Sequence, residues 1–62
     1  MSFEKFKTIV RGMGGMWATN QVVFSRTQSE YHAQCGKESV HLLVPGGYWS
    51  AFGEDAEKRM AW

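Results

Sequence analysis

Residues 20–44, NQVVFSRTQSEYHAQCGKESVHLLV, decide the fold because they divide into three short runs that alternate apolar and polar side chains. This alternation has a period of two and predicts strands. The dipeptide Gly36-Lys37 separates the second and third runs, and a glycine at the first central position favours a type II′ hairpin turn. Such a turn places Cys35 opposite Glu38 and fixes every other pair between the two strands.

The pairs that follow from this turn sort the side chains onto two faces of a sheet. If the first run joins through a tight turn at Thr27-Gln28, Phe24 faces Tyr31 and Val22 faces Ala33. Thr-Gln is a poor two-residue turn, so a longer loop is the alternative. We expect one face to form the core, with the apolar residues Val22, Phe24, Tyr31, Ala33, Val40 and Leu42.

The N-terminal region has the three- and four-residue apolar spacing of an amphipathic helix over about residues 3–13. Ser2 is suited to the N-cap and Gly14-Gly15 to the helix end. The apolar stripe consists of Phe3, Phe6, Ile9, Val10 and Met13.

The segment after the turn signal Pro45-Gly46-Gly47 has two interpretations. One is a single helix, whose stripe contains Trp49, Phe52, Ala56 and Met60. The other is a fourth strand over residues 48–52 and a helix over about residues 54–61, with Gly53 as its N-cap. We favour the second, because acidic residues begin that helix and basic residues end it, as the helix dipole prefers.

These elements predict one small α+β domain over residues 1–62. The expected order is an N-terminal helix, three or four antiparallel strands and a C-terminal helix, αβββ(β)α. Two short helices can cover only one face of the sheet, so we expect both on that face and the other face open.

Composition limits the classes of function. A net charge of +1 and a pI near 7.9 are not typical of a strongly basic nucleic-acid-binding domain. The single cysteine, Cys35, excludes an intrachain disulfide and is expected on the core face. The sequence has no apolar run of membrane-spanning length and no signal-peptide pattern, so we expect a cytoplasmic protein without membrane partners.

The chain lacks the usual catalytic, cofactor-binding and zinc-ligand patterns, so we expect a non-enzyme without cofactor or metal. One constellation stands out, His32 opposite His41. Two imidazoles on adjacent strands could share a metal ion, act as acid and base, or repel each other when both are protonated. A metal site normally needs three or four ligands, which favours solvated histidines or a place in a binding surface.

The open face mixes apolar, aromatic and polar residues, which is typical of a recognition surface. We therefore predict a small regulator or inhibitor, of the kind that phages and mobile elements encode, which binds another protein and has homo-oligomerisation as an option. The predicted partner-binding residues are Trp17, Val23, His32, His41, Leu43 and Trp49.

Two other functions are kept as alternatives. Nucleic-acid binding would use phosphate contacts from Lys5, Lys7, Arg11, Arg26 and Lys37. It includes a helix-turn-helix reading, in which Thr27-Gln28-Ser29-Glu30 is a capping box and Gly36 closes a short helix. A small ribonuclease would use His32 or His41 as acid or base.

The order helix, strands, helix at this length resembles the double-stranded-RNA-binding domain and the small toxin ribonucleases of the HicA type. The chain has the acidic Gly53-Glu54-Asp55 where the former has a lysine-rich helix start, and Ser29-Glu30-Tyr31-His32 where the latter has a Gly-Ser-His approach. The resemblance covers the chain only as topology, so it implies an architecture and no function.

Overall fold

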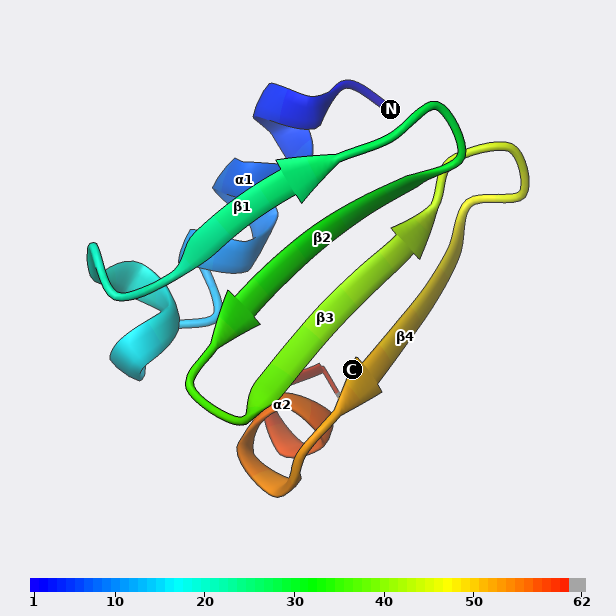
Figure 1. The fold of residues 1–62 in the computed structure, drawn as a ribbon. Helices are drawn as coiled ribbons and strands as arrows, with labels where there is room; N and C mark the ends of the chain where they lie inside the picture. Colours follow the sequence, from blue (N-terminus) through cyan, green and yellow to red (C-terminus); the bar gives the residue numbers. More distant parts are fainter. Residues whose placement is uncertain (61–62) are drawn as a thin grey trace.

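The fold is known from a computed structural model, which describes residues 1–60. Its elements are α1 (Phe3–Arg11), the short 3-10 helix η1 (Gly15–Ala18), β1 (Val23–Arg26), β2 (Glu30–Cys35), β3 (Glu38–Leu43), β4 (Tyr48–Phe52) and α2 (Glu54–Met60). The strands form one antiparallel sheet in the order β1-β2-β3-β4 (Figure 1). The predicted αβββ(β)α class is therefore confirmed, with the fourth strand present.

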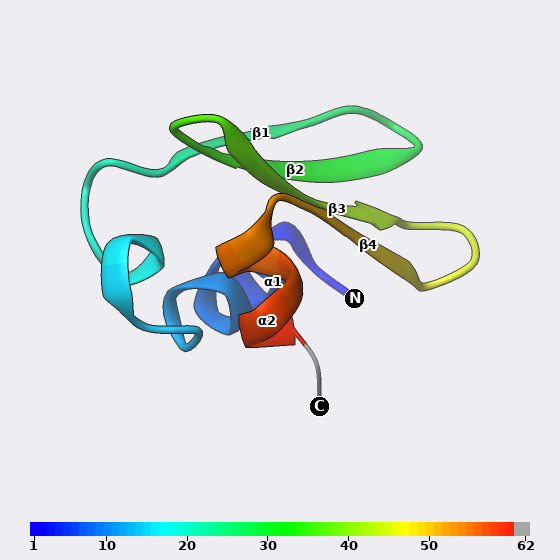
Figure 2. The ribbon, with the colours of Figure 1, turned by 90° about the horizontal axis from the view of Figure 1, so that it is seen from below.

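Both helices pack on the same face of the sheet, as expected, and the opposite face carries no helix (Figure 2). The core lies between these two layers. Its fully or nearly buried side chains are Phe6, Val10, Trp17, Val22, Ala33, Val40, Leu42 and Ala56. Neither helix in the described part of the chain is long and apolar enough to cross a membrane.

The β2–β3 hairpin has the predicted register, with Cys35 opposite Glu38. Gly36 has a φ of 63°, and Lys37, like all described residues other than glycine, has no positive φ. This combination fits a type II′ turn. The turn therefore fixes the pairing of the two central strands.

The register predicted between the first two strands is wrong by two residues. Phe24 lies opposite Ala33, and Arg26 lies opposite Tyr31. Residues 27–29 make a longer loop, in which the Thr27 N–H donates to the Glu30 carbonyl at 2.8 Å. The longer loop forms because no residue near Thr27 supplies the positive φ that a two-residue hairpin turn requires. A shift of two preserves the pleat, so each side chain keeps its predicted face.

The N-terminal helix begins as predicted but ends two residues early. The Ser2 Oγ accepts a hydrogen bond of 3.1 Å from the Lys5 N–H, which confirms the N-cap. Gly12 follows the last helical residue, Arg11, as the C-cap. The chain then turns through Gly14, with a φ of 82°, into η1, an element that the sequence pattern did not reveal.

The C-terminal region adopts the favoured interpretation, a strand followed by a helix. Gly53 joins them with a φ of 115°, and its carbonyl accepts from the Glu57 N–H at 2.9 Å. Residue 61, the last of the predicted helix, lies outside the described residues. The helix-turn-helix alternative is wrong, because residues 30–35 form a central strand.

Candidate functional site: the open sheet face

The sheet face opposite the helices, called the open face below, is built from three rows of cross-strand neighbours. One row is Val23, Gln34, Ser39 and Phe52; the middle row is Ser25, His32, His41 and Ser50; the third is Glu30, Leu43 and Tyr48. Each row follows from the observed register, because residues paired across antiparallel strands point to the same side.

Two stacked histidines occupy the centre of the open face. The ring centroids of His32 and His41 are 4.4 Å apart, and their planes differ by 20°. Counting outward from the hairpin turn, this pair is a non-hydrogen-bonded one, in which side chains approach closely. The alternation of the strands therefore places the two imidazoles in contact.

Neighbouring polar groups hold both rings by hydrogen bonds. The His32 Nδ1 lies 3.3 Å from the Ser25 Oγ, and the His41 Nε2 lies 3.1 Å from the Ser39 Oγ. The His41 Nδ1 is also 3.5 Å from the Glu30 carboxylate. The centre of the face is thus a connected polar patch, half-buried and fixed in orientation.

Exposed apolar side chains surround this polar centre. Six large hydrophobic residues of the described chain are exposed, and four of them belong to the open face. Their exposed fractions are Val23 65%, Leu43 44%, Tyr48 65% and Phe52 58%. The Phe52 ring also packs edge-on against His41, with centroids 5.4 Å apart. Four exposed apolar side chains are therefore gathered on the face that the helices leave uncovered.

Four of the six predicted partner-binding residues lie on the open face, namely Val23, His32, His41 and Leu43. Trp17, the fifth, does not lie there. Its side chain is 1% exposed in the core, because η1 carries it beneath the sheet, where its indole Nε1 donates to Asp55.

Trp49, the sixth predicted partner-binding residue, does not lie on the open face either. Trp49 pairs with Leu42, a core residue, and therefore points to the helix side. There its ring stacks on Phe6 with centroids 5.5 Å apart. The residues that the prediction missed are its neighbours Tyr48 and Phe52, which alternation within residues 48–52 could have identified once that strand was accepted.

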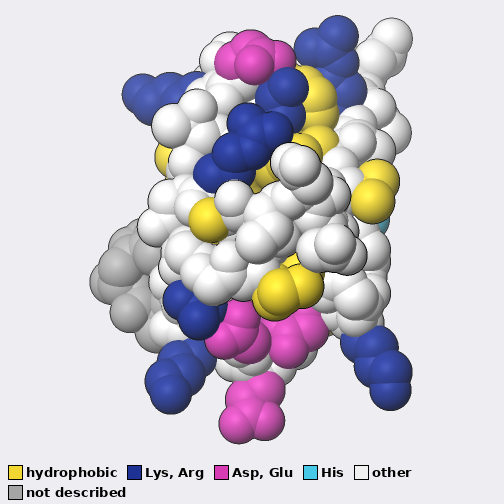
Figure 3. Space-filling view, turned by 90° about the vertical axis from the view of Figure 1, so that its left-hand side faces the viewer, with side chains coloured by type: hydrophobic (Ala, Val, Ile, Leu, Met, Phe, Trp, Pro, Cys, Tyr) yellow, Lys and Arg dark blue, Asp and Glu magenta, His cyan; other side chains and the backbone are white. Residues whose placement is uncertain are grey.

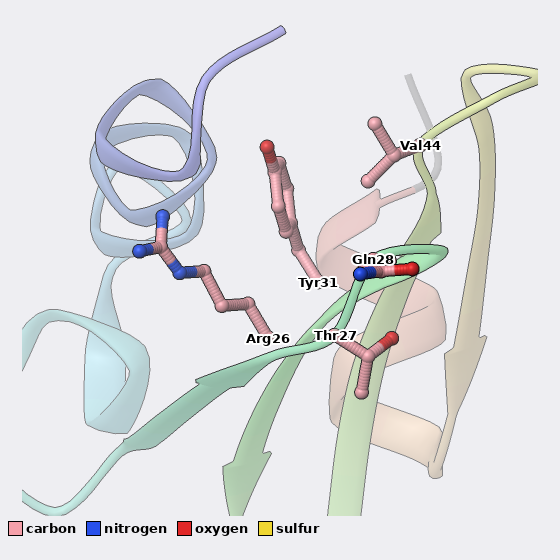
Figure 4. Close-up of a pocket in the computed structure, with 5 residues that line it drawn as sticks. All are labelled: Arg26, Thr27, Gln28, Tyr31 and Val44. Atoms are coloured by element: carbon pink, nitrogen blue, oxygen red, sulfur yellow. The ribbon is translucent and has the colours of Figure 1, made fainter.

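Within residues 1–60 no cluster of three or more His, Cys, Asp and Glu side chains could hold a metal ion. Two hollows of the surface, of about 490 and 380 Å³, are lined by residues outside the open face. Figure 4 shows the larger one, between the β1–β2 loop, Tyr31 and Val44, with Arg26 reaching toward α1.

A second surface feature gathers three of the five predicted phosphate-contacting residues. Lys7, Arg11 and Arg26, called the basic strip below, each place a cationic group about 5 Å from a phenylalanine ring centroid, at 5.0, 5.1 and 5.3 Å. Figure 3 shows Lys and Arg atoms in a diagonal band over hydrophobic atoms.

The other two predicted cations lie elsewhere. Lys5 is two residues from Lys7 in α1, about 200° around the helix. Lys37 is in the β2–β3 turn, at the end of the sheet opposite Arg26.

No protein-family model, curated protein or solved structure matches this chain.

Proposed function

We propose that this protein is a small non-enzymatic binding module that holds another protein against its open face. The observation that carries the proposal is the gathering of four exposed apolar side chains on the one sheet face that no helix covers. Water contact with such side chains is unfavourable, and a partner surface can remove it. A regulator or inhibitor of this kind acts by covering a working surface of its partner.

The size of the face is adequate for a specific complex. The molecule measures 27 × 22 × 19 Å, so its sheet face offers on the order of 600 Å². Specific interfaces bury roughly 800 Å² on each partner, and the smaller ones bury about 600 Å² on each partner. We therefore expect a reversible complex of moderate affinity.

The polar centre supplies specificity. Each of its two histidines is already hydrogen-bonded to a serine, and the Glu30 carboxylate lies 3.5 Å from His41, so a partner can approach without stranding buried polar atoms. A partner that offers a matching polar group to the His32 imidazole gains a hydrogen bond that an unrelated apolar surface would not.

The test is a comparison of partner affinity among three forms of the protein. The wild-type chain captures binding proteins from an extract of its host, and calorimetry then gives the dissociation constant for each. The double variant Leu43→Ser/Phe52→Ser removes two exposed apolar groups of the face. The control, Met16→Ser, removes an apolar residue of similar exposure, 53%, outside the face.

We expect the double variant to bind about 100-fold more weakly, because each lost side chain contributes roughly 1.5 kcal/mol of burial. The control should keep the wild-type affinity, and circular dichroism should show the same fold in all three. Equal affinity of the double variant and the wild type would refute the proposal. Sedimentation velocity of the chain alone shows whether it associates with a second copy of itself. A partner that is a second copy would also contradict the proposal.

A further inference from the structure

The basic strip is organised by two half-buried rings. Lys7 and Arg26, from α1 and β1, both place their cationic groups over Phe3, at 5.0 and 5.3 Å. Arg11 lies over Phe24 at 5.1 Å. Contacts of this kind are attractive and hold long side chains in fewer conformations. The strip is thus a partly preorganised set of positive groups that joins the first helix to the edge strand.

The strip carries an excess of positive charge. The acidic group that pairs with it is Glu4, whose carboxylate lies 2.8 Å from the Lys7 Nζ. The hydrogen bond from Lys7 and the positive charges of Lys7, Arg11 and Arg26 lower the pKa of Glu4. With one anion against three cations, the strip keeps a net charge of about +2.

The cation–ring geometry disfavours single-stranded nucleic acid as the ligand of the strip. Proteins that bind single-stranded nucleic acids stack bases on exposed aromatic faces. Here cations already lie over the two rings, so the rings are poor platforms for bases. A guanidinium that lies on a ring keeps its N–H groups for carboxylates or phosphates, which it binds in a bidentate way. On a protein partner, the groups of this kind are the carboxylates of Asp and Glu.

The location of the strip connects it with the open face. Phe24 and Arg26 alternate along β1 with Val23 and Ser25, which belong to the open face. In Figure 1, β1 forms one edge of the sheet and α1 lies beside it. A partner that covers the open face can therefore reach the strip by passing over this edge.

We propose that the basic strip binds an acidic segment, a run of Asp and Glu side chains, on the protein partner. This inference deepens the proposed function and rests on it for the identity of the partner as a protein. The basic strip attracts the acidic segment and sets the orientation of the complex. The apolar side chains of the open face then stabilise the bound partner.

The first experiment measures binding of probes to the whole chain by fluorescence anisotropy at low salt. The probes are a labelled glutamate-rich peptide, the same peptide with glutamine for glutamate, and single-stranded oligothymidine of the same net charge. The variant Arg11→Gln/Arg26→Gln removes two charges from the strip. The control Lys37→Gln/Lys58→Gln removes the same net charge elsewhere.

We expect the glutamate peptide to bind, the glutamine peptide not to bind, and the strip variant to bind the former about tenfold more weakly. The control and the Leu43→Ser/Phe52→Ser variant should bind the acidic peptide like the wild type. Equal binding of both peptides, tighter binding of oligothymidine, or an equal loss in the control would each overturn the proposal.

The second experiment uses the protein partner that the wild-type chain captures from the host extract. Arg11→Gln/Arg26→Gln should weaken that complex about tenfold, and the weakening should fade as salt rises. Unchanged affinity in this variant, together with a large loss in Leu43→Ser/Phe52→Ser, would overturn the acidic-segment proposal and leave the open-face function standing. The opposite pattern would overturn the open-face function alone.

Discussion

The indole Nε1 of Trp17 donates a hydrogen bond of 3.0 Å to the Oδ2 of Asp55, which lies 38 residues further along the chain. The same carboxylate accepts from the Arg59 Nε at 2.9 Å, and the Arg59 Nη1 donates to the Met13 carbonyl at 2.9 Å. The bond from Trp17 joins η1 to α2, and the bond from Arg59 joins α2 to the turn that precedes η1. They explain why Trp17 is in the core and absent from the open face.

Acid should weaken this connection. The hydrogen bonds from Arg59 and Trp17 lower the pKa of Asp55 below its ordinary value of 3.8. A carboxylate whose pKa is lower in the folded state contributes stability that is complete above the unfolded-state pKa and is lost as pH falls through the folded-state pKa. As the pH falls from neutral to strong acid, we expect the free energy of unfolding to decrease less in Asp55→Asn than in the wild type. Urea midpoints at each pH measure this decrease.

The control for this prediction is Glu4→Gln. Glu4 also has a lowered pKa, but its ion-pair partner is Lys7 of the basic strip. The two substitutions should therefore reduce the acid sensitivity independently, and their effects should add in the double variant. An unchanged pH dependence in Asp55→Asn would contradict the role given to this carboxylate.

Glu38 supplies the cap of α2 from a neighbouring strand. Its carboxylate accepts from the Asp55 N–H at 3.3 Å and from the Ala56 N–H at 2.6 Å. Glu38→Ala should lower the free energy of unfolding by about 1–2 kcal/mol, because two N–H groups of the first helical turn lose their acceptor. Denaturant titration measures this. Glu57→Ala, an exposed carboxylate of the same helix, should change it by less than about 0.5 kcal/mol.

Gly53 is required by both its conformation and its surroundings. Its φ of 115° is unfavourable for residues with a side chain, and a Cβ there would collide with the side chain of Glu38. Gly53→Ala should therefore destabilise the fold by about 1–3 kcal/mol. Gly46→Ala, where φ is not positive and nothing lies within 4 Å, should have almost no effect on the thermal midpoint. Equal midpoints for the two variants would be the contrary result.

The pairing of His32 with His41 can be tested by a disulfide. In a Cys35→Ser background, His32→Cys/His41→Cys should oxidise readily, because the Cα atoms of such a pair are about 4.5 Å apart. The bridge should raise the free energy of unfolding by about 2–3 kcal/mol. The diagonal pair His32→Cys/Leu43→Cys should stay reduced under the same conditions. Thiol titration separates the two, and a bridge in the diagonal pair alone would disprove the register.

The sequence determined the features that depend on neighbouring residues. The Gly36-Lys37 turn fixed the β2–β3 register, and with it the contact of His32 and His41 on the open face. Alternation assigned each side chain of the first strand to the correct face despite the wrong register, because a period of two does not distinguish a shift of two residues.

Only the tertiary structure decided the features that depend on distant partners. Trp17 lies in the core through its bond to Asp55, and Trp49 packs against the core through Phe6; no local pattern connects either pair. The basic strip likewise required α1 to pack beside β1, so that Arg26 met Phe3 and joined Lys7 and Arg11. Periodicity and turn residues encode local geometry, whereas the choice among compatible packings is made by burial and hydrogen bonding across the whole chain.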